Sequence, residues 1–141
     1  GFLSSVRISQ KLDYASRAVV HLAKKHDGQS VTRADDIAES EGIPSSFLAQ
    51  ILHELKRTGV VTSRRGKTGG WKLIEPPADI SLLRIVEALE PEALGQIPEP
   101  TGESGVAVKN LWESVRESSR QILAQNTLET LAAEDEPMFY I

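Results

Sequence analysis

Apolar residues recur every three or four positions along the first part of the chain, and this spacing predicts helices. The first helix is expected over residues 9–26, with Ser9 as its N-cap and with an apolar face formed by Leu12, Ala15, Val19 and Leu22. The second is short. Thr32 and Asp35 approximate a capping box at its start, and the helix is expected to end before Gly42.

A third helix is expected after Pro44, and the pattern then changes to one typical of strands. The helix ends at Gly59, which suits a left-handed cap, and its apolar stripe consists of Phe47, Leu48, Ile51, Leu52 and Leu55. The β-branched run at 60–63 and the alternating segment at 71–74 predict two strands, and the turn-forming residues 66–70 (GKTGG) separate them. These segments therefore predict a β-hairpin with a basic tip.

Two more helical patterns follow, separated by a segment rich in proline and glycine. Ser81 is expected to cap a helix that runs to Glu90, residues 91–108 are expected to form a loop or linker, and a capped turn is expected at 127–131. Between them a long helix over residues 109–126 has an apolar face formed by Leu111, Trp112, Val115, Ile122 and Leu123. Because a small domain offers such a helix little to pack on, we expect this face to form a dimer interface.

The composition is that of an ordinary globular domain with one core. The chain has 141 residues, of which 40% are hydrophobic and 26% charged, and it contains no cysteine. The lack of cysteine excludes disulfides, thiolate metal sites and iron–sulfur clusters held by cysteine. Since neither a membrane-spanning stretch nor a secretory signal is recognisable, the expected location is the cytoplasm, with no membrane partner.

The charge is distributed unevenly, although the net charge is −4. Residues 1–75 carry 12 basic and 8 acidic side chains, whereas residues 76–141 carry 4 and 12. One stretch without any acid holds Lys56, Arg57, Arg64, Arg65, Lys67 and Lys72. This stretch is either a face that binds phosphates or a solvated surface on which basic residues cluster by chance.

The order helix, helix, turn, helix and basic hairpin is typical of a winged helix-turn-helix, in which the third helix enters the major groove of DNA. Ser45, Ser46 and Gln50 lie opposite the apolar stripe of that helix and are therefore candidate base contacts. Gln50 is the best base reader, because an amide can pair with adenine N6 and N7. The alternative is that all three are ordinary solvated side chains.

The hairpin tip supports the DNA-binding interpretation. We expect its glycines, Gly69 and Gly70 among them, to permit positive φ and to let the backbone approach DNA, while Arg64, Arg65 and Lys67 supply charge to a narrow groove. A nucleotide-binding phosphate loop is the rival interpretation. It is disfavoured because GKTGG lacks the GxxxxGK[ST] spacing and precedes a strand instead of a helix.

The sequence resembles the Rrf2 family of bacterial transcription regulators. The strongest match is RGKTGGWKL (residues 65–73), which is similar to that family's wing signature RGxxGGYxL; DIAESEGI (36–43), FLAQIL (47–52), LKRTGVV (55–61) and ISLLRIVEALE (80–90) also match. The resemblance implies a winged helix-turn-helix DNA-binding domain over residues 1–90, a linker over 91–108, a dimerisation helix and capped turn over 109–133, and a tail over 134–141. It also implies a homodimer that binds palindromic double-stranded DNA and usually represses.

The resemblance implies roles for individual residues as well. Base contacts fall on Ser46 and Gln50, a minor-groove contact falls on Arg65, and phosphate contacts fit Lys56, Arg57 and Lys67. Three departures stand out: Ala49 replaces a glutamate found in several members, Leu12 and Asp13 replace a glycine–arginine pair, and residues 91–108 lack the three cysteines of the cluster-binding members. The first departure implies a relaxed or different operator preference, the second removes the arginine expected to make one phosphate contact, and no cofactor is expected.

Other features of the sequence give weaker signals. His21, His26 and His53 are scattered and are expected to be ordinary helix histidines, and since no catalytic constellation is visible, an enzyme is not expected. The tail residues Met138, Phe139, Tyr140 and Ile141 resemble the ending of a cysteine-free family member that controls cysteine metabolism, and this implies docking into cysteine synthase. The tail could instead pack on its own dimer.

The alternative function for the whole chain is a protein-interaction module that has a winged-helix fold and weakened DNA binding.

Overall fold

The computed structural model describes residues 7–134, in which short helices precede a hairpin and one long helix follows it. Helices α1 (Gln10–Lys24), α2 (Ala34–Glu41) and α3 (Ser45–Arg57) come first, followed by the antiparallel strands β1 (Val61–Arg64) and β2 (Gly70–Leu73). After the 3-10 helix η1 (Pro77–Asp79) come α4 (Leu82–Leu89), the 3-10 helix η2 (Pro91–Leu94), α5 (Gly105–Gln125) and α6 (Leu128–Ala133). The predicted fold class, mainly helical with a small hairpin, is confirmed.

Three of the described helices have an N-cap residue whose side chain accepts a backbone hydrogen bond, and the sequence analysis predicted all three caps. Ser9 accepts from the backbone N–H of Leu12 at 3.0 Å at the start of α1, and Ser81 accepts from Arg84 at the start of α4. Thr127 caps α6 in the same way. Each cap satisfies a backbone donor that the first helical turn leaves without a partner.

The predicted cap of α2 is wrong. Arg33 is the N-cap residue, and no side chain caps this helix. The backbone of Thr32 instead forms an isolated antiparallel β-bridge with Trp71 of β2, in which each N–H donates to the other residue's carbonyl oxygen at 2.8 Å. Thr32 thus pairs with the outer side of the hairpin. The capping-box pattern failed here because a long-range backbone pairing already fixes Thr32.

A single core lies beneath the hairpin and between the helices. Helices α1 to α4 and both strands place apolar side chains in this core, and fully buried examples are Val19 of α1, Ile37 of α2, Leu52 of α3, Val61 of β1 and Ile85 of α4. The predicted stripe of α3 is confirmed, since Leu48, Ile51, Leu52 and Leu55 are all buried. The C-cap also follows the prediction, because Gly59 has φ +84° just after the helix.

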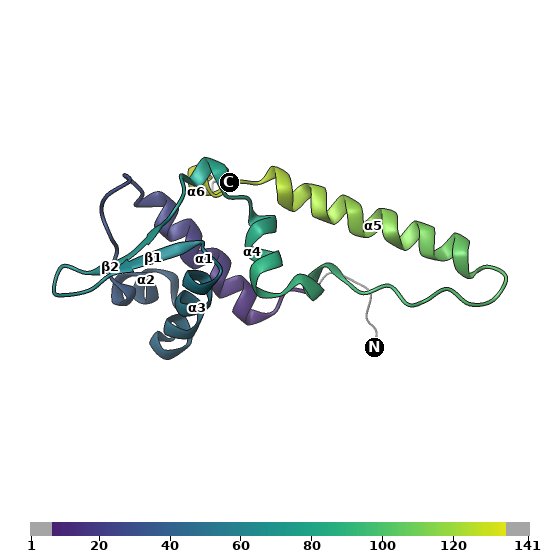
Figure 1. Cartoon of the computed structure of the whole chain (residues 1–141), viewed down its shortest axis with the longest axis horizontal. Coiled ribbons are helices and arrows are strands. Elements are labelled where there is room, and N and C mark those ends of the chain that lie inside the picture. Colours follow the sequence, from purple (N-terminus) through teal and green to yellow (C-terminus); the bar gives the residue numbers. More distant parts are fainter. Residues whose placement is uncertain (1–6, 135–141) are drawn as a thin grey trace, which may run out of the picture.

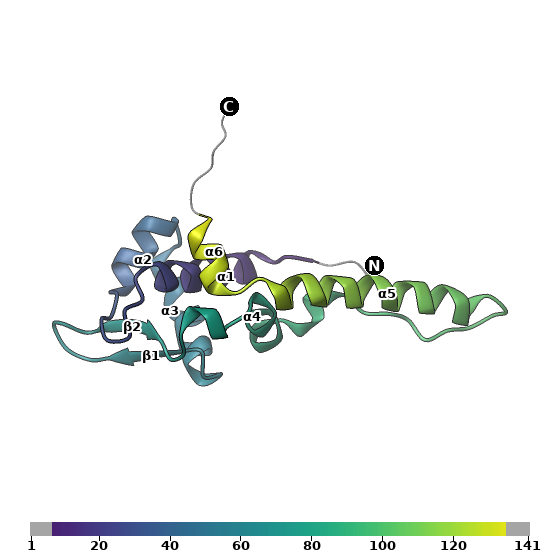
Figure 2. The same ribbon diagram turned by 90° about the horizontal axis from the view of Figure 1, so that it is seen from above.

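Helix α6 returns the chain to this core after α5. The backbone N–H of Leu128 donates to Ile80 O at 2.8 Å, that of Leu82 donates to Asn126 O at 2.9 Å, and the Leu128 side chain is fully buried. The helix packs against α1 and η1. The chain is thus anchored in the winged-helix body on both sides of α5, by η2 before the loop that leads to α5 and by α6 after it (Figures 1 and 2).

The predicted linker is shorter than residues 91–108. Its first residues form η2, which buries Ala93 and Leu94 in the core, and α5 begins at Gly105. Helix α5 extends along the molecule away from the hairpin, so the hairpin and α5 lie at opposite ends of its long axis (Figures 1 and 2).

Candidate nucleic-acid interface

Helix α3 is oriented by aromatic contacts with α1. The ring of Phe47 meets that of Tyr14 edge to face, with centroids 5.3 Å apart, and the guanidinium of Arg17 lies 5.0 Å from the Tyr14 centroid. The buried stripe of α3 faces the same core. This packing leaves the side of α3 that carries Ser45, Ser46 and Gln50 exposed to solvent.

The only acid of α3 is neutralised by α1. Glu54 pairs with Lys11, with N–O distances of 3.0 and 2.9 Å to its two carboxylate oxygens. Lys56 and Arg57 then end the helix as exposed cations. The outer side of α3 therefore presents polar and basic groups to a polyanion without an unpaired carboxylate of its own.

Two contacts fix the hairpin, which forms the wing, against α3. The rings of His53 and Trp71 meet edge to face with centroids 5.5 Å apart, and the Lys56 ammonium donates to Ser63 Oγ at 2.9 Å. His53 is thus an interelement packing contact, consistent with the expected ordinary histidine. The position of the wing relative to α3 is set by side chains from both elements.

A loop after α1 that is closed by its own hydrogen bonds contacts one side of the wing. Arg64 donates to Gln29 O at 2.9 Å, and Lys72 donates to Gly28 O at 3.3 Å. Within this loop, hydrogen bonds from the Ser30 hydroxyl and from the backbones of Ser30 and Gln29 hold the pKa of Asp27 below its usual range. The ordered turn keeps the Gln29 carbonyl in place as the acceptor for Arg64.

The last residue of α3 and two residues of the wing tip are cations exposed to solvent. Arg57, Arg65 and Lys67 are exposed, and none of their side chains forms an ion pair with another residue in 7–134. Arg33, which the sequence analysis missed, donates to Lys67 O at 3.3 Å and so adds a cation beside the tip. The sequence shows only that Arg33 is a basic residue just before the predicted second helix, and no motif marks this position.

The expected reason for two of the wing glycines is wrong. Of the three tip glycines only Gly66 has positive φ, at +102°. A Cβ on Gly69 would lie 2.1 Å from Arg64 O, and one on Gly70 would lie 2.5 Å from Thr32 O. These two positions require glycine because protein backbone approaches them, and their contact with DNA stays a prediction.

The Gly70→Ala variant is expected to be less stable than the wild type by about 1–3 kcal/mol in its free energy of unfolding. The added methyl group must displace Thr32 and so opens the backbone pair with Trp71. Urea unfolding measures the difference, and Thr68→Ala at the exposed tip is the control, with an expected change within about 0.5 kcal/mol. Equal stability of Gly70→Ala and the control would contradict the close-approach explanation.

The predicted dimer residues separate into two groups. Leu111, Trp112, Val115 and Ile122 are exposed, with fractions of 60, 45, 51 and 62%. Leu123 is the exception, since it packs against the core of its own chain. The tail residues Met138, Phe139, Tyr140 and Ile141 lie outside the described residues.

Known proteins that resemble this chain in sequence and structure are transcriptional regulators, which agrees with the winged-helix fold and with its exposed basic surface. The model of the Rrf2 family, described as an iron-dependent transcriptional regulator, matches residues 8–134. The HTH-type transcriptional regulator CymR of Bacillus subtilis is 32% identical over 145 residues, covering 96% of this chain and all of CymR. Its solved structure, titled as that of the global cysteine regulator of B. subtilis, superposes with a TM-score of 0.79 and covers 92% of this chain and 98% of that one. Rv1287 of Mycobacterium tuberculosis, named as an HTH-type regulator, is 36% identical over 136 residues, with 90% of this chain and 81% of that protein covered.

The residues present do not fit the iron implied by the family description. The chain has no cysteine, and residues 7–134 contain no group of three or more histidine, aspartate or glutamate side chains arranged to hold a metal. His21 is buried, with Nδ1 3.0 Å from Glu41 Oε2, and so links α1 to α2. Within the same residues, no helix is long and apolar enough to cross a membrane.

Proposed function

The chain belongs to the Rrf2 family of transcriptional regulators, and on this basis we propose that it acts as a homodimeric repressor that binds a palindromic operator in the cytoplasm. The family is one of DNA-binding regulators and not of enzymes. The observation that carries the proposal is the continuous exposed surface of α3 and the wing. There the exposed side chains of Lys56, Arg57 and Lys67 are available for phosphates, while Glu54 is paired with Lys11.

In this proposal, α3 and the wing read DNA in different ways. Gln50 projects from the exposed side of α3 toward base edges in the major groove, with Ser45 and Ser46 near the start of the helix. Arg65 at the wing tip enters the neighbouring minor groove. Lys56 and Arg57 contact the backbone and position the helix, contributing affinity that is independent of sequence.

The proposed dimer face is the exposed stripe of α5 together with an adjoining apolar cleft. The cleft has a volume of about 320 Å³ and lies where α5, α1, α4 and the residues before α1 meet. Ile122 belongs to both the stripe and the cleft, and Ile8 at its edge is 63% exposed. A second copy is the occupant that the family's palindromic sites call for, since two half-sites require two recognition helices.

The test of this function is selection of bound duplexes from a random pool. The protein is expected to enrich a palindrome whose half-site centres lie one helical turn, about 34–36 Å, or a multiple of it apart. Enrichment of a single half-site would contradict the dimer. No enrichment above non-specific binding would support the interaction-module alternative.

A finer proposal concerns cysteine synthase as a partner for residues 138–141. It is supported by the resemblance of these residues to the ending of a cysteine-metabolism regulator and by the similarity of the whole chain to CymR, titled a global cysteine regulator. A chain ending at Ile141 is expected to bind cysteine synthase in calorimetric titration. A chain ending at Tyr140 is expected to bind at least about tenfold more weakly, because the carboxylate that backbone N–H groups would hold is displaced. Equal affinity of the two chains, or no binding by either, would contradict this partner.

A further inference from the structure

A charged cleft separates α5 from α4 and η2, on the side of α5 away from its exposed apolar stripe. Its volume is about 520 Å³, and Pro91 and Leu94 form an apolar part of the wall. The polar part consists of two arginines and three glutamates, a net charge of −1. Its volume lies within the range of small-molecule sites, but charged side chains make up most of its lining, so a ligand for it must itself be charged.

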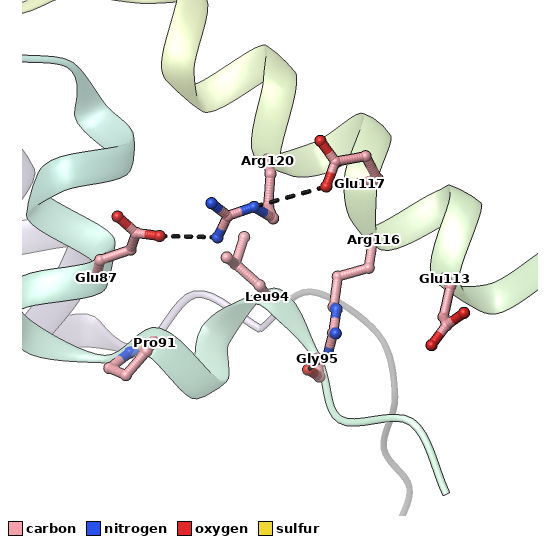
Figure 3. A pocket seen from close by; sticks show the side chains of 8 residues that line it. All are labelled: Glu87, Pro91, Leu94, Gly95, Glu113, Arg116, Glu117 and Arg120. Carbon is pink, nitrogen blue, oxygen red and sulfur yellow. Dashed lines mark hydrogen bonds and ion pairs between the residues drawn. The ribbon is translucent and has the colours of Figure 1, made fainter. Parts of the chain in front are cut away.

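One arginine of the cleft already has carboxylate partners. Arg120 on α5 pairs with Glu87 of α4 at 2.8 Å and lies 3.7 Å from Glu117 (Figure 3). These ion pairs account for Arg120 and for two of the three glutamates. They join α5 to α4 and leave one arginine and one glutamate of the cleft to be explained.

The remaining pair, Arg116 and Glu113, has no such partners. Arg116 is partly buried, and its guanidinium carries five N–H donors, of which one hydrogen bond is made among residues 7–134, a long one of 3.4 Å to Gly95 O. Glu113 forms no ion pair or side-chain hydrogen bond within residues 7–134. Both side chains project from α5 toward the η2 side of the cleft (Figure 3).

We propose that this cleft binds a free α-amino acid. Arg116 receives the carboxylate, Glu113 receives the ammonium group, and Leu94 and Pro91 contact the side chain of the ligand. Residues three apart on a helix have Cβ atoms about 5–6 Å apart, a spacing that suits the two charged groups on one α-carbon. Because the lining carries an excess negative charge, a simple anion is a poorer ligand than a zwitterion.

The position of the cleft gives the ligand a way to influence DNA binding; this step rests on the proposed function. Helix α4 packs on α3, whereas α5 carries the proposed dimer face. A ligand that contacts both η2 and α5 changes how tightly α5 is attached to the winged-helix body. It therefore changes the orientation of that body relative to the proposed dimer interface. It thereby changes how well two recognition helices match two half-sites.

The test is a thermal-shift and calorimetric screen of the full chain, without DNA, against each common amino acid. At least one is expected to raise the Tm and to bind with a Kd of about 1 mM or tighter. The amine and the carboxylic acid that correspond to that amino acid, each lacking one charged group, are expected to bind at least about tenfold more weakly. No binding by any amino acid, or equal binding of the acid lacking the amino group, would overturn the proposal.

Two variants locate the site. Arg116→Gln and Glu113→Gln are each expected to weaken binding of that amino acid at least about tenfold, since each removes one charge-assisted contact. Asn110→Ala, exposed on α5 outside the cleft, is expected to bind like the wild type. Circular dichroism verifies that each variant is folded, and wild-type affinity in both glutamine variants would contradict the site. Because the readout requires no DNA, failure of this proposal is distinguishable from failure of DNA binding.

Discussion

A chain carrying Val115→Glu and Ile122→Lys is expected to be monomeric and to lose operator affinity by a factor of about 10² or more. Both side chains are more than half exposed in one protomer and lie on the same apolar stripe of α5. Burying two charges in an interface is strongly unfavourable. A monomer then engages one half-site at a time and loses the advantage of binding two together. Sedimentation measures the mass, and titration of the selected duplex measures the affinity.

The matched control adds the same two charges elsewhere on the helix. Asn110→Glu and Gln121→Lys are exposed positions, and their spacing places them on a side of α5 away from the stripe. This variant is expected to stay dimeric and to bind the operator like the wild type. A stripe variant that remains dimeric would place the interface on another surface.

Replacing Gln50 by alanine is expected to weaken binding by about 1–3 kcal/mol at one base pair per half-site and to relax the preference there. The reason is the loss of a bidentate contact to a base edge. Arg65→Ala is expected to behave differently, because an arginine in the minor groove responds to groove width. Its effect should depend on A·T-rich flanks and not on one base pair.

Binding profiles across a set of operator variants separate the two roles. Thr68→Ala at the exposed wing tip serves as a control whose profile matches the wild type. If Gln50→Ala lowered the affinity equally for all sequences, Gln50 would be a backbone contact. If Arg65→Ala changed the preference at a single base pair, Arg65 would be a base reader.

Most of the fold could be predicted because apolar spacing, helix caps and turn residues depend on interactions between residues that are near each other in the sequence. The apolar stripes of α1 and α3, the caps at Ser9 and Ser81 and the left-handed residue at Gly59 follow from residues within a few positions of each other. Thr32 shows where this reasoning stops. Its role is decided by Trp71, far along the chain, and no capping pattern reports such a pairing.

The candidate site was predictable where chemistry and periodicity coincide. Gln50 and Arg65 could be found because polar residues opposite an apolar stripe and basic residues at a hairpin tip have recognisable patterns. Arg33 could not be found, since it reaches the wing only through the tertiary fold. The pair Arg116 and Glu113 gave no signal either, because on sequence alone it is one of several charged positions on a solvated helix face.

The most direct test of the central claim is the affinity of the wild-type protein for its selected palindrome as a function of salt concentration. The logarithm of the affinity is expected to fall linearly with the logarithm of the salt concentration, with a slope of about −5, if Lys56, Arg57 and Lys67 of two protomers each neutralise one phosphate. A duplex of scrambled sequence is expected to bind at least about 10³-fold more weakly at physiological salt. An affinity that does not change with salt, or that is equal for both duplexes, would contradict a sequence-specific DNA-binding function.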